Sequence, residues 1–360
     1  MKQPQGRASI IGLGLIGGSL ALALRQADWH VSGSDRDETA VARALELGII
    51  DDENLDEDSD IVFIATPVLA APDQVRRALN ATTCPVTDVG SVKSAISLEL
   101  ANETRFVPGH PMAGNELSKL EGADPSLFRG ATWILTPTEE TSETAYARVH
   151  SIVTNVLGAK VVSMEADRHD SLMAAVSHVP HLTSAAIMQT ATNEAGPYVS
   201  TMYSLAAGGF RDMTRISSGD PDMWVDVAIQ NRDGIDRVLS RLIDTITHMR
   251  TIVRDGNSNV LRQVLLEAQS SRRNLPVRVI AKYSEIRVPV DDRVGVLKEV
   301  TNLATDLDVN IFDFEIAHNA EGDKGTLVLM VEDGAADRLY GGLRARDFKP
   351  QLSRVGPGRS

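Results

Sequence analysis

A glycine-rich stretch near the N-terminus has the spacing of a dinucleotide-binding loop. The stretch Gly12–Gly17, with the sequence GLGLIG, follows a short apolar run and opens a helical pattern. In that context the glycines allow a tight turn, let the backbone approach a pyrophosphate and let the helix pack closely on the strand. The N-terminus of the helix then attracts the anion. The alternative is a glycine-rich turn with no ligand. The residues expected to contact the dinucleotide are Gly12, Gly14, Leu15, Ile16 and Gly17.

An acidic residue ends the second predicted strand. Asp35 lies 18 residues after Gly17, where its carboxylate can accept both ribose hydroxyls of an adenosine. Its charge would repel a 2′-phosphate, so the sequence favours NAD over NADP, although the neighbouring Arg36 could soften that preference. Thr66 ends the third predicted strand at the same edge of the sheet. Its side chain either contacts the dinucleotide or only ends the strand.

A serine and a histidine follow later strands at that edge and could act on an alcohol. Ser91 stands in the segment Asp88–Lys93, and His110 in the segment Gly109–Glu116. A neutral imidazole can take a hydroxyl proton near pH 7 while hydride leaves the same carbon, and such a base contributes about 10²–10⁴ in rate. Ser91 can hold that hydroxyl by a hydrogen bond, or it can cap a helix beginning at Val92. Both side chains should lie beside the nicotinamide.

Two histidines lie in the helical part of the chain, on either side of Pro180. His178 and His181 are spaced i, i+3 and so share a helix face, while Pro180 should kink the helix. We expect these imidazoles to contact the substrate. One alternative is a pair of core histidines with satisfied hydrogen bonds. A metal site is the other, but no second cluster of ligands completes a coordination shell, so no metal is expected.

Arg215 is the candidate for binding an acidic substrate. Its planar guanidinium can hold a carboxylate at two points. The upstream glycines Gly208 and Gly209 let a ligand approach the backbone. The alternative is an ion pair with Asp212 on the same turn, which contributes little if it is exposed.

The elements that position these residues alternate along the first part of the chain. Short apolar runs separate longer helical patterns, which is typical of a Rossmann-type, doubly wound parallel α/β sheet covered by helices. The predicted strands are Ala8–Ile11, His30–Ser34, Ile61–Ala65, Val86–Asp88, Arg105–Val107, Trp133–Leu135 and Lys160–Val162. The predicted helices are Ile16–Arg25, Glu38–Leu47, Ala71–Leu79, Val92–Ala101 and Ser142–Val156.

Two further domains follow, so the predicted domains are 1–165, 166–282 and 283–355. Residues 166–282 carry long amphipathic patterns, typical of an all-α domain that buries its surface against a second copy, so we expect a homodimer. Residues 283–355 predict a small α+β domain of order βαββαβ. Its predicted elements are Glu285–Val290, Gly295–Leu307, Val309–Ala317, Thr326–Glu332, Ala335–Ala345 and a short strand after Phe348.

The composition limits the partners and the compartment. The 360 residues carry a formal charge of −13, which argues against nucleic acid or an anionic membrane and favours a small-molecule partner. Hydrophobic residues make up 42%, the proportion of a folded globular chain. Cys84 is the single cysteine, so no intramolecular disulfide forms and a cytoplasmic location is favoured. The uncharged run Ala8–Leu24 imitates a secretion signal, but glycines interrupt it and it lacks a cleavage site.

Five motifs taken together resemble the prephenate dehydrogenase family of tyrosine biosynthesis. They are, in order, Gly12–Gly17, Gly90–Lys93, His110–Gly114, Ser177–His181 and Asp212–Arg215. The resemblance implies NAD-dependent oxidative decarboxylation of prephenate to 4-hydroxyphenylpyruvate, with conversion of arogenate to tyrosine as the alternative. More distant alternatives are a reductase of imines or β-hydroxyacids, which would need a lysine or other acid in the helical region, and a non-catalytic sensor of NAD and an amino acid.

Carried over residue by residue, the resemblance assigns a role to each candidate. It implies that His110 is the base for the C4 hydroxyl of the substrate and that Ser91 assists by a hydrogen bond. It implies that Arg215 holds the ring carboxylate, so the imidazole and the guanidinium must converge on opposite faces of one bound ring. The remaining implied positions are His178, His181, the Gly208 backbone and Trp224 at the substrate, and Glu116 and Asp212 as acids that can pair with Arg215.

The last predicted domain resembles an ACT domain, a module that commonly binds an amino acid. The turn 291–297, between its first strand and first helix, carries the resemblance. By analogy this domain would bind tyrosine or another aromatic amino acid near Gly295 and Asn310 and so inhibit the enzyme. The alternative is a structural domain that only packs the dimer.

Overall fold

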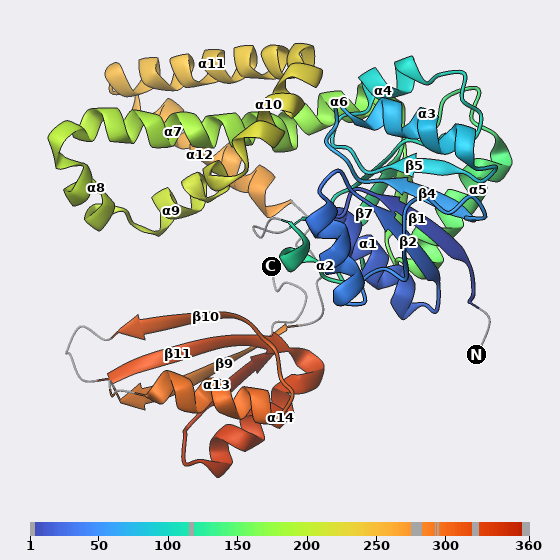
Figure 1. Cartoon of the computed structure of the whole chain (residues 1–360). Coiled ribbons are helices and arrows are strands. Elements are labelled where there is room, and N and C mark those ends of the chain that lie inside the picture. The colour runs from blue at the N-terminus through green and yellow to red at the C-terminus, as the bar shows by residue number, and fades with distance from the viewer. Residues whose placement is uncertain are drawn as a thin grey trace. The chain divides into compact units, whose positions relative to one another are not determined.

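The computed structural model describes residues 4–114, 119–274, 283–291, 293, 295–318 and 324–354. Contacts divide the chain into two compact units, Met1–Gly256 and Asn257–Ser360. Figure 1 labels their helices and strands. The boundaries at 165/166 and 282/283 stay predictions, because this division falls elsewhere. Within the described ranges, no helix is both long enough and apolar enough to cross a membrane.

A parallel sheet of order β3-β2-β1-β4-β5 forms the centre of the first unit. Its strands are β1 (Arg7–Ile11), β2 (His30–Ser34), β3 (Asp52–Glu53), β4 (Ile61–Ile64) and β5 (Val86–Asp88). The two-residue strand β3 is an addition to the predicted strands. The strand order reverses between β1 and β4, and at such a switch point the carboxyl ends of the strands border a ligand-binding crevice.

Helices cover both faces of this sheet. They include α1 (Leu15–Gln26), α2 (Glu38–Glu46), α3 (Ala71–Ala81), α4 (Ser94–Glu99) and α5 (Glu143–Ser151). Successive residues of β4 point to opposite faces: Phe63 packs in the core cluster that includes α1, while Val62 and Ile64 pack in the cluster that includes α3 and α4. All of β4 is buried, as its uninterrupted apolar sequence requires. The predicted doubly wound arrangement is confirmed.

The prediction of a strand at Arg105–Val107 is wrong. Phe106 makes only an isolated bridge to Val86, and Pro108, which has no N–H to donate to a ladder, follows two residues later. A separate sheet forms instead from β6 (Gly109–Pro111), β7 (Thr132–Leu135) and β8 (Lys160–Ser163). Because β6 runs antiparallel to β7, the strands of this half do not form one parallel sheet. His110 consequently lies within a strand.

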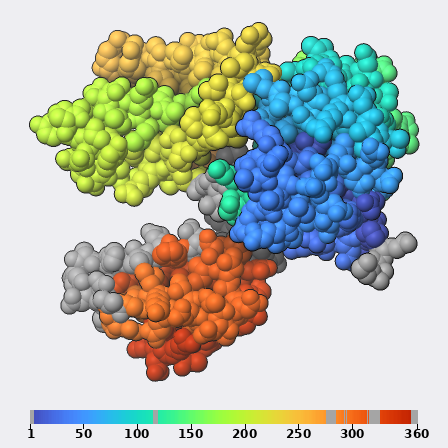
Figure 2. Space-filling view, in the orientation of Figure 1, coloured from blue at the N-terminus to red at the C-terminus, as the bar shows by residue number. Residues whose placement is uncertain are grey.

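The helical part of the first unit extends as an arm from the sheet domain (Figure 2). Its helices are α6 (Ala166–Met173), α7 (Val179–Ala195), α8 (Val199–Leu205), α9 (Gly208–Thr214), α10 (Pro221–Gln230) and α11 (Arg232–Arg254). A π-helical turn, Ala174–His178, joins α6 to α7. Pro180 stands in the first turn of α7, directly after this π-helical turn. A kink at Pro180 stays a prediction.

The second unit begins with helix α12 (Ser258–Arg273) and continues in the order βαββαβ, as predicted. The elements are β9 (Tyr283–Asp291), α13 (Val296–Asp306), β10 (Ile311–His318), β11 (Lys324–Glu332), α14 (Asp333–Ala345) and β12 (Gln351–Arg354). The strands pair antiparallel in the order β10-β11-β9-β12. Val288, Leu329 and Leu339 belong to the apolar core that this sheet forms with its helices.

Candidate active site

The glycine loop between β1 and α1 has space for a ligand at one glycine and none at the others. Gly12 has a φ of +101°, and a Cβ there would lie 2.5 Å from the Ala65 carbonyl oxygen. A Cβ on Gly17 would lie 1.8 Å from the Gly12 carbonyl oxygen, so that glycine is required for helix–strand packing. Around Gly14, no atom lies within 4 Å of the Cβ position. The loop therefore fits a pyrophosphate approaching the backbone at Gly14.

Asp35 supports this loop from the end of β2. Its Oδ2 accepts a hydrogen bond of 2.7 Å from the Leu13 N–H, and its Oδ1 accepts one of 2.9 Å from the Asp37 N–H. A carboxylate has about four acceptor positions, so both oxygens can still accept ribose hydroxyls. The side chain of Arg36 is exposed. Beyond β4, the buried Thr66 Oγ1 has no hydrogen-bond partner among the described residues, which leaves it available to a ligand.

A chain of hydrogen bonds supports His110 on β6. His110 Nδ1 lies 2.8 Å from His169 Nε2, and His169 Nδ1 lies 2.7 Å from Asp170 Oδ1. The two imidazole rings meet edge to face, with centroids 5.0 Å apart. His169 and Asp170 are both buried on α6, far from His110 in the sequence. We call this chain of three side chains the relay.

The carboxylate of Asp170 determines which nitrogen carries hydrogen in each ring of the relay. An ionised carboxylate only accepts, so His169 Nδ1 carries its hydrogen and donates it. His169 Nε2 is then an acceptor, His110 Nδ1 donates to it, and a lone pair remains on His110 Nε2. Burial raises the pKa of Asp170, but hydrogen bonds from His169 and from the start of α4 outweigh that effect and lower it overall. Asp170 is therefore ionised at neutral pH.

The pKa of His110 lies well below its ordinary value of 6.5. Burial is the largest cause, the proximity of His169 and Lys93 lowers the pKa further, and the attraction of Asp170 opposes these effects. The imidazole is thus neutral at pH 7 and keeps its lone pair, which is the state that a general base requires.

Asp170 also holds the turn that follows β5. Its two carboxylate oxygens each accept a hydrogen bond of 2.8 Å, from the Lys93 N–H and from the Ser94 N–H. Helix α4 begins at Ser94, and its N-cap residue Lys93 makes no capping bond with its own side chain. The alternative that Ser91 caps a helix from Val92 is therefore wrong, because the capping carboxylate comes from α6. Ser91 lies half-buried in the preceding turn.

A buried ion pair joins the end of β5 to β6. The fully buried ammonium of Lys93 bonds the carboxylate of Asp88, and it donates to the Gly109 carbonyl oxygen at 2.8 Å. Asp88 in turn accepts hydrogen bonds from the Gly90 N–H at 2.9 Å and the Gly109 N–H at 3.1 Å. Burial lowers the pKa of Lys93, and the attraction of Asp88 opposes this. The pair fixes the strand of the candidate base against the neighbouring turn.

The other two candidate histidines share contact with Trp224 of α10. His181 stacks on the indole with centroids 3.6 Å apart, and His178 meets it edge-on at 6.2 Å. Asn231 Nδ2 lies 3.0 Å from His178 Nδ1 and donates to the Asp170 carbonyl oxygen at 2.8 Å. Burial lowers the pKa of both histidines, that of His178 to about 4. This group, the Trp224 cluster, therefore joins the relay through the backbone of Asp170.

Arg215 begins a 3₁₀ turn that contacts α7. Its side chain is exposed. At the end of this turn Gly219 lies against the stacked rings: a Cβ there would be 2.8 Å from Trp224 Nε1 and 3.1 Å from His181 Cε1. The structure thus brings the arginine's turn to the Trp224 cluster. Convergence of Arg215 and His110 on one bound ring stays a prediction.

The remaining candidate residues lie on α9 or outside the residues that the structure describes. Gly208 and Asp212 are exposed on α9, and open space surrounds the Cβ position of Gly208. Glu116 lies outside the described residues, so its expected pairing with Arg215 stays a prediction. Among the residues that the structure describes, no three His, Cys, Asp or Glu side chains are grouped as metal ligands.

The chain is similar to known proteins over both parts of this site. Residues 20–163 match the family model described as the nucleotide-binding domain of prephenate dehydrogenase, and residues 165–267 match the model of its dimerization domain. The prephenate dehydrogenase of Bacillus subtilis (strain 168) is 33% identical over 345 residues, covering 91% of this chain and 92% of the relative. The chain belongs to the prephenate dehydrogenase family.

Two solved structures of the family extend the similarity to the fold. Prephenate dehydrogenase from Aquifex aeolicus, in complex with hydroxyphenyl propionate and NAD⁺, is 30% identical with a TM-score of 0.71 and covers 76% of this chain and 100% of its own. Arogenate dehydrogenase from Synechocystis is 29% identical with a TM-score of 0.64 and covers 74% of this chain and 99% of its own. The family thus includes proteins named for either substrate.

Sequence reasoning missed the residues behind the candidate base. These residues are His169 and Asp170, an imidazole and a carboxylate on α6. His169 lies 59 residues after His110 in the sequence. Their position in the helix before His178 indicated only that they belong to the same arm. Nothing in the sequence indicated Asn231, because its contacts with Asp170 and His178 span 61 and 53 residues.

The depressed pKa of His110 predicts the acid limb of the pH profile. Protonation of Nε2 removes the lone pair, so activity is present above the folded-state pKa and falls as the pH drops through it. Because that pKa lies well below 6.5, kcat/KM should stay level as the pH falls through 6.5 and decline only at lower pH. The measurement is kcat/KM against pH in the forward direction. An acid limb centred at 6.5 or above would contradict the assignment.

Proposed function

We propose that the protein catalyses the NAD-dependent oxidative decarboxylation of prephenate to 4-hydroxyphenylpyruvate, in tyrosine biosynthesis. The observation that carries the proposal is the relay, which leaves His110 neutral and with its lone pair on Nε2. Membership of the prephenate dehydrogenase family supports the choice of substrate. NAD fits the open space at Gly14 and the carboxylate at the end of β2.

In this scheme, side chains of the protein take one proton from the substrate hydroxyl and later return it to the same oxygen. Bound NAD supplies the hydride acceptor for the hydrogen on C4 of the cyclohexadiene ring. As the C4–H bond breaks, His110 Nε2 takes the proton of the C4 hydroxyl, and Ser91 holds that oxygen by a hydrogen bond. His169 and Asp170 offset the positive charge that His110 then carries. The ring carboxylate leaves as CO₂, its bonding electron pair makes the ring aromatic, and the C4 oxygen regains the proton from His110.

Arg215 holds the ring carboxylate in this scheme. Its guanidinium binds the carboxylate at two points before the reaction begins. Two observations support this role: the side chain is exposed, and Gly219 at the end of the same turn packs against the Trp224 cluster. His178, His181, the Gly208 backbone and Trp224 bind the rest of the substrate, and Glu116 and Asp212 are the acids that pair with Arg215.

Arogenate is the second candidate substrate. It differs from prephenate in carrying an amino group where prephenate has a side-chain keto group, and the chemistry at C4 is the same for both. The similarity to the Synechocystis protein named arogenate dehydrogenase favours keeping this alternative. Measuring NADH formation with each compound distinguishes the two hypotheses.

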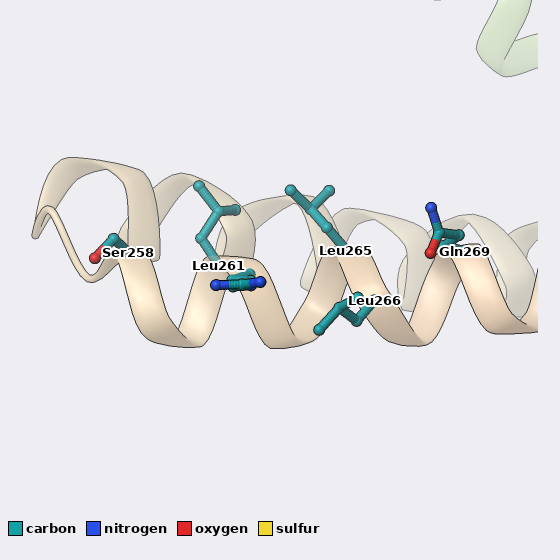
Figure 3. Close-up of a pocket in the computed structure, with 6 residues that line it drawn as sticks. Ser258, Leu261, Leu265, Leu266 and Gln269 are labelled. Carbon is teal, nitrogen blue, oxygen red and sulfur yellow. The ribbon is translucent and has the colours of Figure 1, made fainter.

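The working protein is a cytoplasmic homodimer in this proposal. The 16-residue helix α12 has no buried residue in the described chain, although it carries Leu261, Leu265 and Leu266, which line a pocket on its surface (Figure 3). On α11, Ile243 and Ile246 are more than half exposed. Exposed apolar helix faces need a partner surface, and the dimerization-domain match covers all of α11 and the part of α12 up to residue 267. The lone, buried Cys84 supports a reducing compartment.

The C-terminal unit is a regulatory, ACT-like domain in this proposal. The βαββαβ order, the antiparallel sheet and the positive φ of Gly295 before α13 support that reading. Tyrosine or another aromatic amino acid would bind near Gly295 and Asn310, both exposed. Added tyrosine should then lower NADH formation by the full chain. If no aromatic amino acid changes the activity, the regulatory role is rejected and the domain has a structural role only.

The direct test of the function is NADH formation with prephenate and with arogenate. We expect the wild type to reduce NAD with prephenate. Substituting His110→Asn removes the base and should lower kcat by about 10²–10⁴ while NAD affinity stays unchanged, because the imidazole is not part of the glycine loop. Absence of NADH with both substrates would reject the proposal. Near-normal turnover by His110→Asn would reject the base.

A further inference from the structure

A buried nitrogen in the Trp224 cluster has no hydrogen-bond partner among the described residues. His178 is 2% exposed, and its Nε2 makes no hydrogen bond to any described residue. Its other nitrogen, Nδ1, lies 3.0 Å from Asn231 Nδ2. A buried polar atom without a partner costs free energy, so an orphaned atom in a site usually has a ligand or a water to bond.

The backbone of Asp170 decides which nitrogen of His178 carries hydrogen. Asn231 Nδ2 donates one hydrogen to the Asp170 carbonyl oxygen at 2.8 Å, and a carbonyl oxygen can only accept. The opposite orientation of the amide would set two oxygens against each other. The second hydrogen of the same NH₂ group therefore points to His178 Nδ1, which accepts it. The hydrogen of the neutral ring is left on Nε2.

We propose that Asn231 is a positioning residue that holds His178 as the Nε2–H tautomer, and that this N–H donates to the side-chain keto oxygen of the substrate. The inference rests on the proposed function and names which of its two substrates the site favours. The favoured substrate is the keto acid, prephenate.

The assignment to the keto oxygen follows from what the other groups of the site already bind. The C4 hydroxyl goes to His110 and Ser91, and the ring carboxylate goes to Arg215. The acceptors that remain are on the side chain. Of these the keto oxygen is neutral and matches a neutral N–H, whereas a carboxylate is better matched by a cation.

The same donor disfavours the amino acid. An ammonium group has three hydrogens to donate and no lone pair, so it leaves the Nε2–H unpaired. His178 can accept at Nε2 only if the Asn231 amide flips, and the flip would place the amide oxygen against the Asp170 carbonyl oxygen. Protonating the ring would not help, because an imidazolium repels an ammonium, and burial holds the pKa of His178 at about 4.

The tautomer can be read without any substrate. In the full-length protein labelled with ¹⁵N-histidine, His178 should show a protonated Nε2 and an unprotonated Nδ1. The signal is assigned by its loss in His178→Gln. A His178 ring with hydrogen on Nδ1 would overturn the proposal. This result does not depend on which reaction the protein catalyses.

Two substitutions of His178 separate the donor from the packing of the ring. In His178→Asn the side-chain oxygen can still accept from Asn231, but no group reaches the position of Nε2. In His178→Gln the amide NH₂ lies near that position. We expect His178→Asn to raise KM for prephenate about tenfold, with a smaller change in kcat and no loss for arogenate, and His178→Gln to restore most of the loss. Equal KM values for wild type and His178→Asn would overturn the proposal.

Gly234→Ala tests Asn231 without changing its chemistry. A Cβ on Gly234 would lie 2.3 Å from Asn231 Oδ1, and its three nearest atoms would all belong to that side-chain amide. Because alanine favours the helix, the variant should fold while displacing the amide. It should raise KM for prephenate as His178→Asn does, and an unchanged KM would contradict the positioning role.

His150→Gln is the matched control. His150 lies on α5 against Tyr146, outside the relay and the Trp224 cluster, and its substitution should leave both KM values unchanged. If the wild type forms no NADH with either substrate, the proposed function and the choice of the keto acid fail together. The ¹⁵N spectrum would still decide the tautomer in that case.

Discussion

The carboxylate of Asp170 is the interaction on which the candidate site depends. It accepts hydrogen bonds from the ring of His169 and from the first N–H groups of α4, and its own carbonyl accepts from Asn231. One residue of the helical arm therefore orients the base, caps the helix beside Ser91 and orders the Trp224 cluster. Each hydrogen bond to a buried charge contributes about 1.5–3 kcal/mol, so the loss of this carboxylate would affect the sheet domain and the arm together.

Burial gives the site its chemical character. The imidazoles of His110 and His178 both have lowered pKa values because the surroundings disfavour an added charge. For His110 this keeps a lone pair for the hydroxyl proton, and for His178 it keeps a neutral N–H. Among the residues that the structure describes, the charges buried near these imidazoles are paired: Asp170 by its hydrogen bonds, and Lys93 by Asp88. The protein thus places neutral reacting groups on a framework of compensated charges.

The sequence predicted those parts of the site that are built from neighbouring residues. The glycine loop needs a positive φ at Gly12 and close packing at Gly17, and both demands appear as glycines in a short motif. The histidine on β6 could be predicted as a base, but its strand could not be placed, because the apolar residues before Pro108 resemble a strand while β6 begins only at Gly109. The contacts that orient it join residues up to 77 positions apart, such as Lys93 and Asp170, and no local pattern encodes them. The order βαββαβ was predictable because strand and helix periods alternate within a short segment.

The most direct test of this account is the turnover of Asp170→Asn with prephenate and NAD. The substituted amide keeps the shape of the carboxylate, but it no longer obliges His169 to donate, so the lone pair on His110 Nε2 is no longer enforced. We predict that kcat falls by at least about 100-fold while the protein remains folded in a thermal unfolding scan and binds NAD as before. A folded Asp170→Asn enzyme with kcat within about threefold of the wild type would contradict the relay.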